Sequence, residues 1–152
     1  MIIKDDNMKH IFIGYSNKDK IVARCIYRHL TRRNWSNVEI FMDEFSIKPS
    51  ENWRDKCLKQ AGIADLGVIV LSEYTRKSEY VPEEEGFLKG RGIPVIYVAL
   101  HEEWKIPSGY GKTIKSFPLY ESKNPTVGFD DLTELIANTL NTCLAKMCHL
   151  HF

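Results

Sequence analysis

Apolar residues gather in short runs that alternate with segments of helical periodicity. Five runs are typical of strands: Ile11–Ile13, Val38–Met42, Leu66–Leu71, Ile93–Ala99 and a weaker one, Ile114–Leu119. The third and fourth runs are apolar on both faces, as strands are when helices cover both sides of their sheet. Pro118 favours an edge position for the last strand, because proline cannot donate a hydrogen bond to a neighbouring strand.

Between these runs, apolar residues recur at the spacing of amphipathic helices. The stripes that predict four helices are Val22–Leu30, Trp53–Ala61, Val81–Leu88 and Leu132–Met147. Before the first helix, Ser16 to Asp19 fits a capping box. Ser50 can cap the second helix and Gly62 can end it, and Trp53 is expected in its core-facing stripe. Pro82 is the expected first residue of the third helix.

The alternation of strands and helices predicts a doubly wound parallel α/β sheet of about five strands flanked by helices. Residues 1–8 are expected to be an N-terminal extension, and residues 9–150 a single domain without repeats or linkers. The segment from His101 to Lys112 is less regular and is expected to be a loop or a short helix. Ligands of such sheets bind at the carboxyl ends of the strands, so the loops after the strands are the expected site.

Composition and charge narrow the function classes. The chain has 152 residues, 43% of them hydrophobic, with 21 Lys plus Arg against 20 Asp plus Glu, a net charge of +1. This balance argues against electrostatically driven binding to nucleic acid or to a membrane. No apolar run approaches the ~20 residues of a membrane helix. Asp5 and Asp6 stand where a signal peptide would have its apolar core, so a cytoplasmic protein is expected.

The chain contains 4 cysteines, whose spacings match no zinc pattern. Cys25, Cys57 and Cys143 fall on apolar helix stripes, which predicts ordinary buried thiols. The tail from Cys143 to His151 brings soft metal ligands close together, but a frayed helix end is the preferred interpretation and no metal is expected.

Three consecutive glutamates follow Pro82 within residues 78–85. A proline followed by acids is typical of a helix start, where an acid interacts favourably with the helix dipole by about 0.3–1 kcal/mol. With Pro82 first, Glu84 is third and falls on the apolar face. The residues alone leave two roles open for Glu84: a helix cap, or a catalyst beside the carboxyl ends of the strands. Its neighbours Glu83 and Glu85 are expected to be solvated or supporting charges.

Three segments, in order and at suitable spacing, resemble a TIR (Toll/interleukin-1 receptor) domain, particularly of the bacterial and plant kind. Ile11–Asp19 is similar to the family's opening strand and its F-I-S-Y-S-x-x-D turn. Met42–Arg54 resembles the BB loop, about residues 43–52 here, and the helix that follows it. Val68–Ser72 with Ser78–Glu84 resembles V-V-L-S … S-x-W-C-x-x-E.

Four positions depart from the family's pattern. Tyr80 stands where the family usually has Trp, Val81 replaces a common Cys, Gly14 a common Ser, and Ser50 a common Gly. Tyr80 keeps an aromatic face for stacking, and the glutamate at position 84 is retained.

The resemblance implies a flavodoxin-like TIR fold and an NAD+ glycohydrolase activity. Such an enzyme cleaves the nicotinamide–ribose bond to give nicotinamide plus ADP-ribose or a cyclic ADP-ribose, in bacterial anti-phage immunity or cell-death signalling. NAD+ is then a substrate and no cofactor is needed, and Glu84 matches the catalytic glutamate. The alternative is a non-catalytic TIR adaptor that works through TIR–TIR association.

The resemblance also implies substrate-binding positions: Gly14, Tyr15, Ser16, Asp43, Phe45, Ser72 and Tyr80. Several have plain structural alternatives. Asp43 can contact ribose or order its loop through an Asx turn, Phe45 can cover nicotinamide or pack the loop, and Ser16 can be a helix cap alone.

Lys48 and Arg54 supply positive charge suited to the pyrophosphate of NAD+. Expected partners, besides NAD+, are further copies of the chain bound through the BB loop, and a separate effector or other TIR domains. No nucleic acid and no membrane is expected among them.

Overall fold

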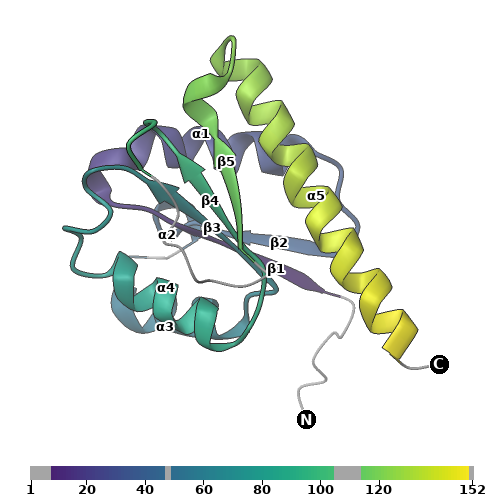
Figure 1. Ribbon diagram of the computed structural model, residues 1–152. Helices are drawn as coiled ribbons and strands as arrows, with labels where there is room; N and C mark the ends of the chain where they lie inside the picture. Colours follow the sequence, from purple (N-terminus) through teal and green to yellow (C-terminus); the bar gives the residue numbers. More distant parts are fainter. Residues whose placement is uncertain (1–7, 47–48, 105–113, 151–152) are drawn as a thin grey trace.

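The computed structural model describes residues 8–46, 49–104 and 114–150 (Figure 1). In these residues, five strands form one sheet in the order β2-β1-β3-β4-β5, and every neighbouring pair is parallel. The strands are β1 (Lys9–Gly14), β2 (Val38–Phe41), β3 (Leu66–Leu71), β4 (Val95–Ala99) and β5 (Ile114–Pro118). All five expected strands are confirmed, and β5 lies at the edge, as Pro118 predicted.

Helices cover both faces of this sheet. They are α1 (Lys20–Arg32), α2 (Asp43–Ser46), α3 (Trp53–Ile63), α4 (Val81–Gly90) and α5 (Pro125–Leu150), with 3-10 turns η1 (Asn17–Asp19) and η2 (Leu119–Glu121). α1 and α5 pack on one face, and α3 and α4 on the other (Figure 1). The expected doubly wound architecture is confirmed. Its strand order reverses between β1 and β3, so a ligand is expected at their carboxyl ends.

Two apolar layers hold the helices to the sheet. In β1, Ile11 and Ile13 pack toward α1 and α5, whereas Phe12 packs toward α3 and α4. This alternation is the two-residue period of a strand. All six residues of β3 are buried, which explains why that run lacks polar positions.

The start of α3 differs from the expectation. The cap is Asn52, whose side-chain oxygen accepts a hydrogen bond from the Asp55 N–H at 3.1 Å. Ser50 was therefore the wrong choice, since it lies two residues too early for this geometry. Gly62 lies within the helix, which ends at Ile63.

The start of α1 also differs. Ser16 accepts from the Lys18 N–H at 3.4 Å, as a cap does. The second half of the expected capping box is missing, because the Asp19 carboxylate accepts a hydrogen bond from the Ser72 hydroxyl at 2.5 Å instead. Ser16 consequently begins a 3-10 turn, and α1 starts only at Lys20.

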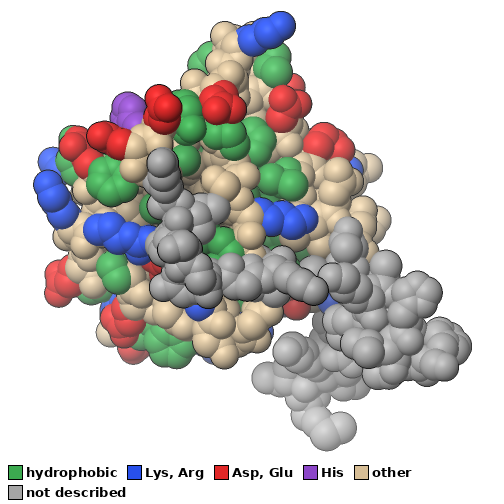
Figure 2. Space-filling model, in the orientation of Figure 1, with side chains coloured by type: hydrophobic (Ala, Val, Ile, Leu, Met, Phe, Trp, Pro, Cys, Tyr) green, Lys and Arg blue, Asp and Glu red, His purple; other side chains and the backbone are tan. Residues whose placement is uncertain are grey.

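Some expectations concern residues outside the described ranges. These residues are 1–7 of the expected N-terminal extension, Lys48, and residues 105–112 of the irregular segment. Across the described residues, no helix has both the length and the apolar character needed to cross a membrane. Acidic and basic side chains are interspersed over the face shown in Figure 2, in keeping with the small net charge.

Candidate active site

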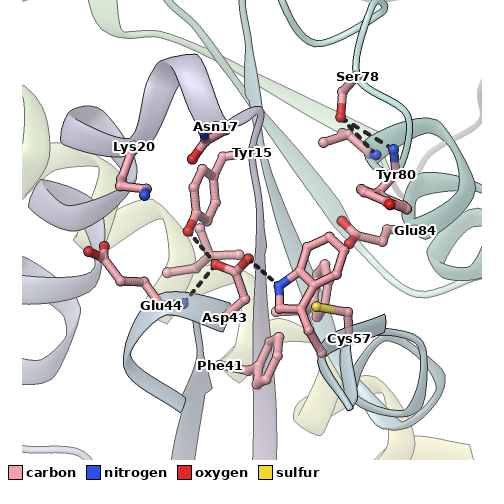
Figure 3. Close-up of a pocket in the computed structure, with 14 residues that line it drawn as sticks. Tyr15, Asn17, Lys20, Phe41, Asp43, Glu44, Cys57, Ser78, Tyr80 and Glu84 are labelled. Carbon is pink, nitrogen blue, oxygen red and sulfur yellow. Dashed lines mark hydrogen bonds between the residues drawn. The ribbon is translucent and has the colours of Figure 1, made fainter. Parts of the chain in front are cut away.

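A cavity of about 350 Å³ opens at the carboxyl ends of β1 and β2, between them and the first turns of α3 and α4 (Figure 3). It lies at the carboxyl-end edge of the sheet, where ligands are expected. Of the strands at the reversal point, β1 lines it directly, whereas β3 contributes only through the residues that follow it, Ser78 to Glu84. The cavity is lined by Phe12, Ile13, Tyr15, Asn17, Lys20, Phe41, Asp43, Glu44, Trp53, Cys57, Ser78, Tyr80, Val81 and Glu84.

Glu84 projects from the first turns of α4 into this cavity, opposite Tyr15 and Lys20 (Figure 3). The residue is buried, with 5% of its surface exposed. Gly14, at the end of β1, passes close by. A Cβ added there would meet Glu84 Oε2 only at an ordinary contact distance of 3.5 Å, but would lie 2.7 Å from Ile69 Cδ1. The Ile69 side chain, rather than the carboxylate, therefore fills the space that glycine leaves.

Burial raises the pKa of Glu84 to about 7, because the ionised form loses its water. The nearby Arg54 lowers the pKa, whereas the negative charges of Asp43 and Glu83 raise it. The carboxyl is thus divided between its two protonation states at neutral pH, as suits a group in a functional site.

Among the described hydrogen bonds, the Glu84 carboxylate accepts from Arg54 rather than from a backbone N–H at the start of α4, where the cap position is Tyr80. The Ser78 hydroxyl accepts from the N–H groups of Tyr80 and Val81 at 3.4 and 3.3 Å. Val81 is the first residue of α4, so Pro82 is second and Glu84 fourth, one position later than expected. The Glu84 N–H already donates to the Tyr80 carbonyl at 3.1 Å. The Glu84 carboxylate is therefore not needed as a cap.

Asp43 joins three elements around the cavity. Its Oδ1 accepts from the Tyr15 hydroxyl and, at 2.7 Å, from the Glu44 N–H, while its Oδ2 accepts from Trp53 Nε1 at 2.9 Å. Burial and the Asp43 carboxylate raise the pKa of Tyr15, so the phenol remains a donor. These bonds occupy both oxygens and favour the loop-ordering role of Asp43 over direct contact with ribose.

Aromatic rings form the wall beside Glu84. The Trp53 ring meets Tyr80 edge-on at 4.6 Å between centroids. Trp53 is 37% exposed, so its expected place in the core was wrong. As the first residue of α3 it lies at the end of the helix, where its indole N–H reaches Asp43.

The structure brings Tyr15, Asp43, Tyr80 and Glu84 together around the cavity. Gly14, Ser16 and Ser72 are not among the residues that line it. Ser16 and Ser72 are buried, and the Ser72 hydroxyl donates to Asp19. Phe45 belongs to α2, but its side chain is outside the description.

Sequence reasoning missed several lining residues, notably Lys20, Cys57 and Ser78. The position of Lys20 could have been predicted from the sequence, because it begins the helix that follows the first strand and its loop, at the edge where ligands bind. Cys57 gives no signal beyond its apolar stripe. Burial raises the pKa of its thiol to about 12, which excludes it as a nucleophile at neutral pH.

We expect Ser72→Ala to lower the free energy of unfolding by about 1–2 kcal/mol, since the buried Asp19 carboxylate loses its hydroxyl donor. Denaturant unfolding measures this loss. An unchanged stability with weakened substrate binding would instead indicate that the hydroxyl contacts the substrate.

Comparison with known proteins gives the fold and the family. Among solved structures, a diflavin flavoprotein A3 from Nostoc sp. is similar, with a TM-score of 0.52 and 12% identity over 95% of this chain and 99% of that one. A flavodoxin-like domain from a Synechococcus sp. protein also has a TM-score of 0.52 and 12% identity, over 90% of this chain and 99% of that one. At such identity the likeness shows the flavodoxin-like fold alone.

No curated protein matches the sequence significantly. The family model described as TIR domain matches residues 11–133, which is most of the chain. The protein therefore belongs to the TIR domain family.

Proposed function

We propose that this protein is an NAD+ glycohydrolase that cleaves the bond between nicotinamide and ribose. The TIR family includes enzymes of this kind as well as non-catalytic adaptors, so the proposal rests on the residues of this chain. The observation that carries it is Glu84, a buried carboxyl that points into an aromatic-lined cavity at the carboxyl ends of the strands.

The reaction asks for one carboxylate. Glycosidases use two, one of them to protonate the leaving group. The nicotinamide ring of NAD+ is already cationic and leaves as a neutral molecule with the bonding electron pair, so no acid is needed. Positive charge then develops on the ribose C1′, and the Glu84 carboxylate stabilises it electrostatically. Attack by water gives ADP-ribose and releases a proton, whereas attack by a hydroxyl or ring nitrogen of the same molecule gives a cyclic product.

The cavity supports this substrate class. Its volume of about 350 Å³ is near the lower end of ligand sites, about 300–1,000 Å³. We infer that it holds the nicotinamide riboside end, with the flat ring against Tyr80 and Trp53. Lys20, which lines the opposite side, supplies a cation for the diphosphate.

The rest of NAD+ then extends beyond the cavity. TIR domains commonly self-associate or bind other TIR proteins. We extend the proposal to assembly through the BB loop, residues 43–52, with a second copy completing the site. The product would carry a signal to a separate effector.

Incubation of the purified protein with NAD+ over a series of protein concentrations tests the proposal. The expected result is release of nicotinamide together with ADP-ribose or a cyclic ADP-ribose, more per molecule when the protein is concentrated enough to assemble. Absence of nicotinamide release at every concentration would favour the adaptor alternative.

We further expect kcat/KM for NAD+ to rise with pH and to reach half its maximum near pH 7. The reason is that the ionised carboxylate is the active form, and the pKa of Glu84 is about 7. Nicotinamide release measured between about pH 5 and pH 9 gives this profile. A midpoint close to 4.5, the ordinary value for a glutamate, would contradict the assignment.

A further inference from the structure

Arg54, in the first turn of α3, makes three contacts beside the cavity. Its NH1 lies 3.3 Å from Glu84 Oε1, and its NH2 pairs with Glu83. Its guanidinium carbon lies 4.5 Å from the centre of the Tyr80 ring. Only 21% of the side chain is exposed, so water screens these contacts less than it screens a surface ion pair.

The charges around Glu84 are unequal. Glu83 of α4 and Asp43, at the start of α2, carry negative charges that disfavour the ionised form of Glu84. The neutral Cys57 thiol of α3 adds no charge. Among the described groups that act on Glu84, Arg54 is the cation that favours the ionised form. Lys20 lies across the cavity.

The shape of the guanidinium matters as much as its charge. A planar fork can bond two carboxylates at its edge and rest its face on a ring, which an ammonium group cannot do. In this arrangement Arg54 links the Glu84 carboxylate to the Tyr80 ring, which itself touches Trp53. One side chain thereby fixes both the expected catalyst and the wall beside it.

From the sequence, Arg54 was expected to supply positive charge for the pyrophosphate of NAD+. The structure assigns it differently, because its nitrogens already pair with Glu83 and Glu84. We propose, resting on the proposed function, that Arg54 is a positioning residue that orients the Glu84 carboxylate, supplies the positive charge that favours its ionised form, and holds Tyr80 in place.

The test compares Arg54→Met, Arg54→Gln and Arg54→Lys with Arg33→Met as a matched control. Arg33 also pairs with a glutamate, Glu134, and lies 5.0 Å from the centre of an aromatic ring, that of Trp35. It follows α1, at the end of the sheet opposite the cavity, so its loss removes the same kinds of contact without touching the site.

In Arg54→Met and Arg54→Gln, we expect the pH profile of kcat/KM for NAD+ to move upward by about one pH unit. Activity at pH 7 then falls about fivefold and largely returns near pH 9. Arg54→Lys keeps the charge, so its profile stays near that of the wild type, while KM rises because the support of Tyr80 is lost. Arg33→Met should match the wild type in profile and KM.

A second measurement does not depend on activity. Labelling the glutamate side-chain carboxyls with 13C allows NMR titration of Glu84, identified by the signal lost in Glu84→Gln. We expect its titration midpoint to rise in Arg54→Met and Arg54→Gln but not in Arg33→Met. If neither the wild type nor any variant cleaves NAD+, the enzymatic proposal fails. The titration still decides whether Arg54 favours the ionised form of Glu84. Equal midpoints in wild type and both neutral variants would overturn the inference.

Discussion

Glu84→Gln is expected to lower nicotinamide release at pH 8 by about 10²–10³-fold and, at the same pH, to make the protein more stable. Glutamine keeps the shape of the side chain but lacks the negative charge that, in the proposed reaction, stabilises the developing cation. The loss of one aligned electrostatic group in an active site has an effect of this size. Product release from NAD+ measures the activity, and thermal unfolding the stability.

The stability gain follows from the direction of the pKa shift. The folded-state pKa of Glu84 is about 7, raised from 4.5. Its contribution to stability is therefore fully present below pH 4.5 and is lost as the pH rises through 7. A neutral glutamine avoids this loss. The free energy of unfolding of Glu84→Gln, relative to that of the wild type, should therefore grow by about 2 kcal/mol between pH 5 and pH 8. For a chain of this length that difference is about 4–8 °C in Tm.

The control for this variant is Glu134→Gln. Glu134 is an exposed glutamate of α5 that pairs with Arg33. We expect this control to leave both activity and its pH profile unchanged. Undiminished turnover in Glu84→Gln, with the fold intact, would refute the assignment of Glu84 as catalyst. A loss of stability in that variant at pH 8 would show that the carboxylate is needed for the fold.

The sequence was sufficient where the physics is local or periodic. β3 and β4 are continuous apolar runs, which predicts strands buried on both faces, and both are buried throughout. The inward direction of Glu84 was likewise predictable, because Glu84 lies three positions after Val81 and four before Leu88, a spacing that puts all three on one helix face. A shift of one position in the first helical residue did not change that face.

The contacts that build the site were not predictable, because they join residues distant in the sequence. Ser72 and Asp19 are 53 positions apart, and Arg54 and Glu84 are 30 apart. Nothing in their spacing indicates a pair. Each side chain also had an acceptable local role, a hydroxyl at a strand end or a cation for a phosphate, and only the folded arrangement decides between the roles.

The cap of α3 shows the same limit within a short stretch. Ser50 and Asn52 are both good capping residues, so intrinsic preference does not choose between them. The structure joins the start of the helix to the start of α2 through the hydrogen bond from Trp53 Nε1 to Asp43. This contact accounts for a helix that begins at Trp53, and with it for the exposure of an aromatic residue expected in the core.

Glu85→Gln should have the opposite effect from Glu84→Gln, lowering the free energy of unfolding at pH 7 by about 3 kcal/mol. Glu85 is 3% exposed. It accepts hydrogen bonds from the Tyr97 hydroxyl and, each at 2.6 Å, from Arg76 and Lys89. Glutamine removes the negative charge that these donors share, and hydrogen bonds to a charged group contribute about 1.5–3 kcal/mol each. Denaturant unfolding at two pH values measures the effect.

The pH dependence distinguishes the two glutamates. Although burial alone would raise the pKa of Glu85, its hydrogen bonds with Lys89, Tyr97 and Arg76 lower it below the ordinary 4.5. The stability that it contributes is therefore present above pH 4.5 and is lost as the pH falls through the folded-state value. The deficit of Glu85→Gln should be full at pH 7 and should shrink below pH 4.5. The gain of Glu84→Gln should instead grow as the pH rises from 4.5 through 7.

Glu85 does not line the cavity, so Glu85→Gln assayed well below its melting temperature should still release nicotinamide. If Glu85→Gln lost activity while folded and Glu84→Gln kept it, the two roles would have to be exchanged. Two adjacent carboxyls on one buried face thus separate by their partners. Glu85 accepts hydrogen bonds from three side chains and stabilises the fold. Glu84 accepts from Arg54, and in the proposed reaction its negative charge stabilises the cationic transition state.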